Sequence, residues 1–232
     1  MTHLQREIER LKRKVLALGA LVEENLRLAV RAIETHDVAK ARKVIAGDVR
    51  IDVNEVEVEE ECLKLLALYQ PVASDLRFII AVIKIDNELE RIGDLAVNIA
   101  ERAEQLAAEY PVPVPPSLTV MADRMRTMIG KALDALVQQD AVVARKVLAA
   151  DDEVDELYRR LLEELKEELR ADLQHLDAIV LMFNVARYME RLADHATNIA
   201  EEVLYMVEGE ISRHQLPDTP GDLLGVSDPE DV

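Results

Sequence analysis

Apolar residues recur at spacings of three and four along most of the chain, the period of an amphipathic helix. The clearest apolar stripe occurs twice, in 85–106 and again in 185–206. Its members are Ile85, Leu89, Ile92, Ala96, Ile99, Ala103 and Leu106, then Val185, Met189, Leu192, Ala196, Ile199, Val203 and Met206. A stripe with this alternation of four and three faces two neighbouring helices, so the pattern predicts helix bundles.

The same period predicts three helices in each half of the chain. They cover roughly 2–34, 39–69 and 71–109 in the first half, and 118–138, 142–170 and 176–208 in the second. Asp37 and Asp140 each stand just before a helix and are expected N-caps. Pro71 suits the first turn of a helix. Gly47 is expected to divide its helix into a short piece and a long one.

The two halves also repeat each other in sequence. Residues 88–101 (ELERIGDLAVNIAE) match 188–201 (YMERLADHATNIAE). Residues 41–48 (ARKVIAGD) match 144–151 (ARKVLAAD). Because two separate motifs recur in the same order, the chain is predicted to contain an internal duplication.

The border between the repeats is the segment YPVPVPP at 110–116, since proline removes a backbone donor and stops a helix. We therefore expect an all-α protein of two tandem antiparallel three-helix bundles related by internal duplication, with repeat 1 in 1–112 and repeat 2 in 117–208. Residues 209–232 are rich in Pro, Gly and Asp, which predicts a disordered acidic tail.

Composition narrows the function classes. The net charge is −18 and no basic run stands out, which argues against nucleic-acid binding and suits cations or basic protein partners. No apolar stretch reaches about 18 residues, so contact with a membrane is expected only through partner proteins. The charged N-terminus is unlike a secretory signal. Cys62 is alone, which excludes an internal disulfide and agrees with a cytoplasmic location.

Carboxylates four residues apart run beside the apolar stripe in both repeats. The pairs are Asp48 with Asp52, Glu90 with Asp94, Asp151 with Asp155, and Glu190 with Asp194. The polar stripe continues as Asn98 and Glu101 in the first repeat and as Asn198 and Glu201 in the second, a second tier of candidate ligands. A single acidic pair of this kind is more often solvated surface, since the chain has 46 acidic residues.

The alignment of the two helices of each hairpin strengthens the interpretation of these pairs as metal ligands. In an antiparallel hairpin turning at 70–71, or at 170–174 in the second repeat, carboxylates of the two helices come level. The level pairs are Asp48 with Asp94, Asp52 with Glu90, Asp151 with Asp194, and Asp155 with Glu190. Four convergent anions cost several kcal/mol unless a cation lies between them. Their hard oxygens suit Mg²⁺, Ca²⁺, Mn²⁺ or iron, so the sequence predicts one metal site per repeat.

Other polar residues are weaker candidates. Arg91 and Arg191 follow the glutamates and are expected to pair with a neighbouring carboxylate, or else to contact phosphate or a partner. His195 adjoins Asp194, but the first repeat has Leu95 there, which argues against an essential ligand. Cys62 is expected to be a buried structural thiol. The chain has no His-Glu-x-x-His, no Glu-x-x-His and no Gly-rich phosphate loop, so it is not expected to be an enzyme.

With the motifs ERIGD at 90–94 and ERLAD at 190–194, and with QPVASDLR at 70–77, the chain resembles the PhoU family. The resemblance implies a pair of three-helix bundles that form a homodimer without catalytic turnover. It implies a negative regulator of phosphate uptake and phosphate-starvation signalling, coupling the ATPase subunit of a phosphate ABC transporter to a sensor histidine kinase.

The resemblance also implies a multinuclear metal cluster in each repeat, with iron favoured. The family's Glu/Asp-x-x-x-Asp motifs fall on the four acidic pairs named above. One departure is that Gly93 becomes Ala193 in the second repeat, which puts equal size of the two sites in doubt. Three other interpretations stay open: an accessory regulator of an ion-coupled phosphate transporter, a carboxylate-bridged di-metal enzyme, and a coiled-coil scaffold.

Overall fold

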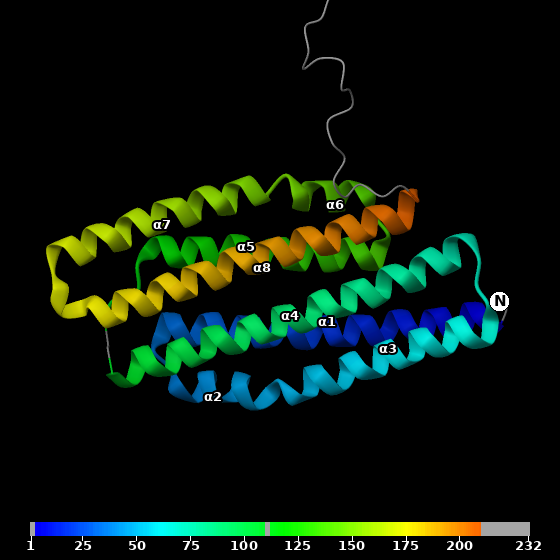
Figure 1. The fold of residues 1–232 in the computed structure, drawn as a ribbon, viewed down its shortest axis with the longest axis horizontal. Coiled ribbons are helices and arrows are strands. Elements are labelled where there is room, and N and C mark those ends of the chain that lie inside the picture. Colours follow the sequence, from blue (N-terminus) through cyan, green and yellow to red (C-terminus); the bar gives the residue numbers. More distant parts are fainter. Residues whose placement is uncertain (1–2, 110–111, 210–232) are drawn as a thin grey trace, which may run out of the picture.

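The chain folds into two helical bundles that lie side by side (Figure 1). The computed structural model describes residues 3–109 and 112–209, and no strand occurs in these ranges. The first bundle consists of α1 (His3–Thr35), α2 (Val38–Gly47), α3 (Val49–Tyr69) and α4 (Ala73–Glu109). The second consists of α5 (Pro116–Gln138), α6 (Ala141–Leu148), α7 (Asp151–Ala171), the short 3₁₀ helix η1 (Leu173–His175) and α8 (Leu176–Glu208). The predicted all-α fold of two duplicated bundles is confirmed.

The two longest helices of the repeats, α4 and α8, join the bundles. They run antiparallel and side by side, and α1 and α5 also contact each other (Figure 1). Every member of the two predicted apolar stripes is buried, for example Ile92 and Leu192, each with no exposed surface. The stripes therefore build the core, and the carboxylates one or two positions away along α4 and α8 are left at its edge.

The second helix of each repeat is broken at the point where its first cluster aspartate lies. The break at Gly47 is confirmed, since α2 ends there and Asp48 stands between α2 and α3. In the second repeat the prediction of one helix over 142–170 is wrong, because Ala149 and Ala150 separate α6 from α7. An Ala-Ala pair carries no intrinsic signal for a break, since alanine is the best helix former.

The predicted N-caps are confirmed. The Asp37 carboxylate accepts a hydrogen bond from the Lys40 backbone N–H, and the Asp140 carboxylate accepts from Val142 and Val143. The prediction for Pro71 is wrong, because α4 begins only at Ala73. Gln70 ends α3 with a left-handed backbone (φ 46°) and turns the chain. Pro71 follows in this turn and is buried.

Two further predictions concern membrane-spanning helices and the acidic tail. None of the described helices is long and apolar enough to cross a membrane. The predicted acidic tail lies outside the described residues, apart from Gly209, which ends α8 with a left-handed backbone (φ 79°). Glycine adopts that conformation without strain, which is why it often ends a helix, as Gly209 does here.

Candidate metal centres

The first carboxylate cluster lies where the junction of α2 and α3 packs against α4. A Cβ atom placed on Gly93 would lie 3.7 Å from Asp48 Oδ1, so the aspartate is level with this turn of α4, as the register argument predicts. Burial raises the pKa of Asp48, and the charges of Asp52 and Asp94 raise it further. Burial and then Asp94 likewise raise the pKa of Glu90. The four carboxylates of repeat 1 are therefore near neighbours.

The second cluster, formed by α7 and α8, brings its four carboxylates together more completely. Burial, then Asp155 and Asp194, raise the pKa of Asp151 to about 6. Burial, then Asp194, Asp155 and Asp151, raise the pKa of Glu190. Each member of this cluster is thus close enough to repel others across the two helices, as its predicted register requires.

Neither cluster is neutralised by a basic side chain. Within 3–109 and 112–209, no ion pair involves any of the eight cluster carboxylates. Elsewhere on α7 an acidic pair with the same spacing is paired: Glu163 lies 2.6 Å from Lys166, and Glu167 lies 2.5 Å from Arg170. The cluster carboxylates therefore keep their mutual repulsion, whereas the repulsion between Glu163 and Glu167 is relieved by basic neighbours.

The expected pairing of Arg91 and Arg191 with cluster carboxylates does not occur. Both arginines are exposed, and neither forms an ion pair in the described part of the chain. Arg91 lies near enough to oppose the rise in the pKa of Glu90, but burial and Asp94 outweigh it. A positive charge is therefore present beside each cluster without entering it.

The donor set fits a hard cation. All eight side chains offer carboxylate oxygens, the ligands that Mg²⁺, Ca²⁺, Mn²⁺ and iron accept, and no sulfur ligand lies among them. As they stand, no three His, Cys, Asp or Glu side chains in the described ranges converge closely enough to hold one ion. The helices thus bring the carboxylates level, while repulsion between like charges opposes their convergence.

The second-tier candidates lie apart from the clusters or have other partners. Asn98 donates to the backbone oxygen of Asp94, one turn earlier. Glu101 is exposed and lies 3.9 Å from Arg102. Asn198 donates to the Glu88 carboxylate of the other bundle, 3.0 Å away. Glu201 is half-buried on α8.

The Asn198 contact belongs to a polar bridge between the bundles that the sequence did not reveal. His195 Nδ1 lies 2.7 Å from Glu88 Oε2, the same oxygen that Asn198 contacts. Burial acts to raise the pKa of Glu88, but hydrogen bonds from His195 and Asn198 lower it on balance. In the duplicated sequence the equivalent residues are Tyr188 and Leu95, so comparison of the repeats pointed away from this bridge.

We expect Glu88→Ala to lower the free energy of unfolding by about 1–3 kcal/mol, because it leaves two half-buried polar side chains without their acceptor. Urea denaturation measures this, with the exposed Glu101→Ala on the same helix as the control. A double-mutant cycle with His195→Ala then isolates the bridge. Strictly additive losses in that cycle would mean that Glu88 and His195 contribute independently.

Repeat 1 carries three further carboxylates, Asp86, Glu55 and Glu59, that the periodic pattern does not distinguish from other acidic residues. Asp86 on α4 is only 1% exposed, and its Oδ1 has no hydrogen-bond partner in the described ranges. Burial, then the charges of Glu55 and Glu59 on α3, raise its pKa to about 8. Cys62 is buried as predicted, and burial, then Asp86, raise the pKa of its thiol to about 12, which leaves it unreactive.

In repeat 2 the equivalent positions are uncharged. When the repeats are aligned so that Asp48 matches Asp151, Glu55 and Glu59 match Tyr158 and Leu162. When they are aligned so that Glu90 matches Glu190, Asp86 matches Ala186. The additional carboxylates are therefore specific to the first bundle.

Comparisons with known proteins cover both bundles. The family model for the PhoU domain matches residues 15–103 and 118–203. The phosphate-specific transport system accessory protein PhoU homolog of Aquifex aeolicus is 42% identical over 212 residues, covering 91% of this chain and 96% of that protein. The Escherichia coli accessory protein PhoU is 32% identical over 208 residues, covering 90% and 86%. The crystal structure of PhoU from Pseudomonas aeruginosa superposes with a TM-score of 0.87 at 37% identity, covering 90% and 100%.

Proposed function

Because the chain belongs to the PhoU family, we propose that it is an accessory regulator of a phosphate-specific transport system. In this proposal it restrains phosphate uptake and represses the phosphate-starvation response when phosphate is abundant. It acts in the cytoplasm as a homodimer, without catalytic turnover, by contacting the ATPase subunit of the transporter and a sensor histidine kinase. Its relatives are named as accessory proteins of phosphate-specific transport systems, which supports the role in phosphate transport.

The proposal includes a metal in each carboxylate cluster, with iron favoured and Mn²⁺, Mg²⁺ or Ca²⁺ as alternatives. Its ligands would be Asp48, Asp52, Glu90 and Asp94 in the first bundle, and Asp151, Asp155, Glu190 and Asp194 in the second. The observation that carries this part is that all eight lack an ion-pair partner in the described ranges, although cluster members raise one another's pKa values.

A bound cation would supply the positive charge that each cluster lacks. The carboxylates on the second helix of a repeat and those on the third would then bind the same metal centre. This would fix how the two helices pack and stiffen the outer face of each bundle, and a regulator needs such a defined face to contact its partners.

A reporter of the phosphate-starvation response tests the function, in cells that hold the cognate transporter and kinase but lack this protein. We expect the chain to repress the reporter at high phosphate. The variant Glu90→Ala/Asp94→Ala/Glu190→Ala/Asp194→Ala should lose most of that repression, because its clusters no longer hold the helices together. Glu163→Ala/Glu167→Ala removes an acidic pair that is already neutralised, so it is the matched control.

Two results would change the proposal. Failure of the wild-type chain to repress the reporter contradicts the regulatory function. Full repression by the cluster variant, with normal protein abundance, contradicts a signalling role for the metal and leaves it as a structural element.

A further inference from the structure

Glu55 occupies a core position of α3. The apolar stripe of that helix consists of Ile51, Val58, Cys62 and Leu65, all of them buried. Spacings of four and three residues place Glu55 in this stripe, between Ile51 and Val58, and its side chain is half-buried. A carboxylate therefore lies where the heptad pattern predicts an apolar residue.

Asp86 faces this position from α4. In the hairpin alignment that brings Asp52 level with Glu90, Glu55 and Asp86 are level to within one residue, about 1.5 Å along the helix axis. Glu59 follows Glu55 by one turn on the same face of α3, and it is exposed. Burial, then the charges of Glu55 and Glu59, raise the pKa of Asp86, so both glutamates lie close to it. Three carboxylates thus share one place, which is open to solvent on the side of Glu59.

The carboxylate of Asp86 lacks the partner that its burial requires. The side chain is 1% exposed, and its Oδ1 accepts no hydrogen bond within the described part of the chain. Neither Glu55 nor Glu59 forms a hydrogen bond or an ion pair with any residue of 3–109 or 112–209. Protonation of Asp86 would remove its charge but would give Oδ1 no partner. A bound cation would supply both.

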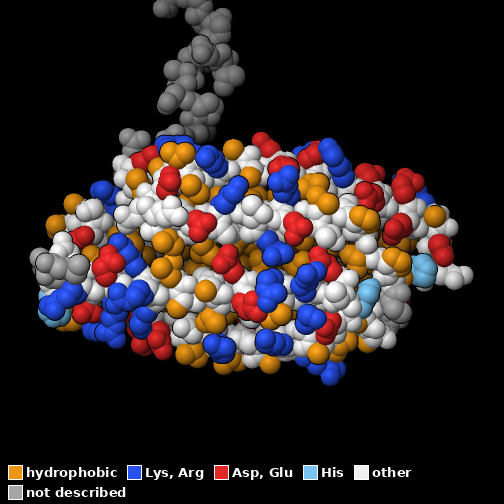
Figure 2. Space-filling model, turned by 180° about the vertical axis from the view of Figure 1, so that it is seen from behind, with side chains coloured by type: hydrophobic (Ala, Val, Ile, Leu, Met, Phe, Trp, Pro, Cys, Tyr) orange, Lys and Arg blue, Asp and Glu red, His pale blue; other side chains and the backbone are white. Residues whose placement is uncertain are grey.

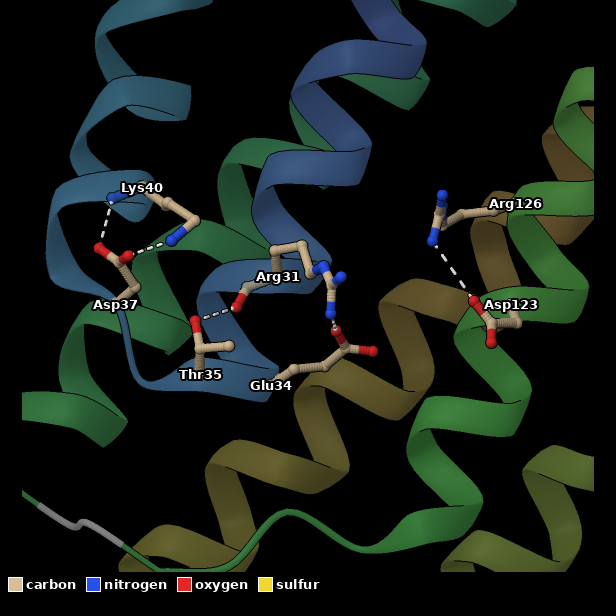
Figure 3. Close-up of polar contacts among 7 residues, drawn as sticks. All are labelled: Arg31, Glu34, Thr35, Asp37, Lys40, Asp123 and Arg126. Carbon is tan, nitrogen blue, oxygen red and sulfur yellow. Dashed lines mark hydrogen bonds and ion pairs between the residues drawn. The ribbon is translucent and has the colours of Figure 1, made fainter.

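Other carboxylates of the first bundle do have basic partners. On α3 itself, Glu57 lies 3.0 Å from Lys14. Glu61 lies 3.4 Å from Lys64. Acidic and basic side chains are interspersed across the face shown in Figure 2. Figure 3 shows three such pairs: Arg31 with Glu34, Asp37 with Lys40, and Asp123 with Arg126.

The equivalent place in the second bundle is apolar. Tyr158, which matches Glu55, packs against the core, and Ala186, which matches Asp86, is buried. The same helix packing thus forms without any carboxylate at these positions. The three acidic side chains are an addition to the first bundle, and in the absence of a cation they oppose its stability.

We propose that Asp86, Glu55 and Glu59 bind a divalent cation at a third site, separate from the two four-carboxylate clusters. Their hard oxygens suit Mg²⁺, Mn²⁺ or Ca²⁺, with water completing the coordination shell. The site is displaced from the first cluster along both helices. Asp86 lies one turn, about 6 Å, from Glu90 along α4, and Glu59 lies about 10 Å from Asp52 along α3.

The third site is expected to hold its ion less tightly than the clusters, because it has three carboxylates instead of four. The ion should therefore exchange with solvent through the exposed side of Glu59 and be lost during gel filtration. Binding is accordingly measured at equilibrium. The inference does not depend on the metal centres of the proposed function.

Mn²⁺ is the probe, and electron paramagnetic resonance measures the free ion at equilibrium. The parent is the full chain carrying Glu90→Ala/Asp94→Ala/Glu190→Ala/Asp194→Ala, so that both clusters are disabled. Adding Asp86→Asn to this parent should lower the Mn²⁺ affinity at least about tenfold, and adding Glu59→Gln should also lower it. Adding Glu60→Gln, which removes an exposed charge from the same helix, should leave the affinity unchanged.

The wild-type background gives a second, independent measurement. At equilibrium the wild type should bind one more Mn²⁺ per chain than Asp86→Asn, although both should retain the same amount of metal after gel filtration. Circular dichroism confirms that each variant is folded. The proposal is overturned if Asp86→Asn binds as much Mn²⁺ as its parent in both backgrounds, or if Glu59→Gln leaves the affinity unchanged. A wild type that retains no metal after gel filtration would contradict the two clusters only, so the two failures are distinguishable.

Discussion

Wild-type protein reconstituted with iron, manganese or magnesium is expected to retain metal after gel filtration, and the variant Glu90→Ala/Asp94→Ala/Glu190→Ala/Asp194→Ala is expected to retain almost none. The reason is that each substitution pair removes half of a four-carboxylate set, and the remaining aspartates cannot form a closed shell of oxygen ligands. Mass spectrometry of the purified proteins measures the metal content, and circular dichroism measures the helicity. We expect helicity to persist, because the mutated side chains lie outside the buried stripes.

Repeat-specific variants make this prediction sharper. Glu90→Ala/Asp94→Ala should remove the metal of the first bundle only, and Glu190→Ala/Asp194→Ala that of the second. Glu163→Ala/Glu167→Ala on α7 should leave the metal content unchanged, since its acidic pair is already neutralised by Lys166 and Arg170. A wild-type protein that stays metal-free after reconstitution would refute both centres and leave the carboxylates as a surface for a basic partner.

Replacing the buried Asp86 by asparagine is expected to stabilise the protein at pH 8 by on the order of 2–4 kcal/mol. The side chain is 1% exposed, its Oδ1 has no partner in the described ranges, and Glu55 and Glu59 repel its negative form. Asparagine keeps the size of the side chain and never ionises. The second repeat has Ala186 at this position, which shows that the fold does not require a carboxylate there.

The pH dependence gives the sign of the effect. The pKa of Asp86 is about 8 in the folded protein and near the ordinary 3.8 when the chain is unfolded. Between these pH values the folded state keeps a proton that the unfolded state has lost, so the contribution of Asp86 to stability decreases as the pH rises from about 4 to about 8. Asp86→Asn removes this decrease, so its advantage should be small at pH 4 and largest at pH 8.

Urea denaturation of metal-free protein at pH 5 and pH 8 measures this effect. Glu60→Gln removes one exposed negative charge from α3 and serves as the control. If Asp86→Asn instead lowered the free energy of unfolding at pH 8, the carboxylate would have a stabilising partner, and repulsion by Glu55 and Glu59 would not govern its energetics.

The periodic apolar pattern was sufficient to predict much of this structure. The buried stripes, the duplication, the Asp37 and Asp140 caps and the level positions of Asp48 and Asp94 all depend on spacing along helices and across one hairpin. Such spacing is a local property, since 3.6 residues per turn decide which side chains share a face. The acidic clusters could be located for the same reason.

Tertiary packing decided what lies between the bundles and where helices break. The Glu88–His195 bridge and the contact of α1 with α5 join residues about one hundred positions apart, and no periodicity within one repeat relates them. The break at Ala149 and Ala150 opposes local helix propensity, so it depends on the packing of the surrounding helices. Tertiary packing also decides the surroundings of Asp151, because α8 brings Asp194 beside it, whereas Glu163 is neutralised by Lys166 three residues along the same helix. The sequence alone thus determined the bundles and their acidic faces, whereas the docking of one repeat on the other created the bridge and the contact of α1 with α5, because those contacts exist only once both bundles have folded.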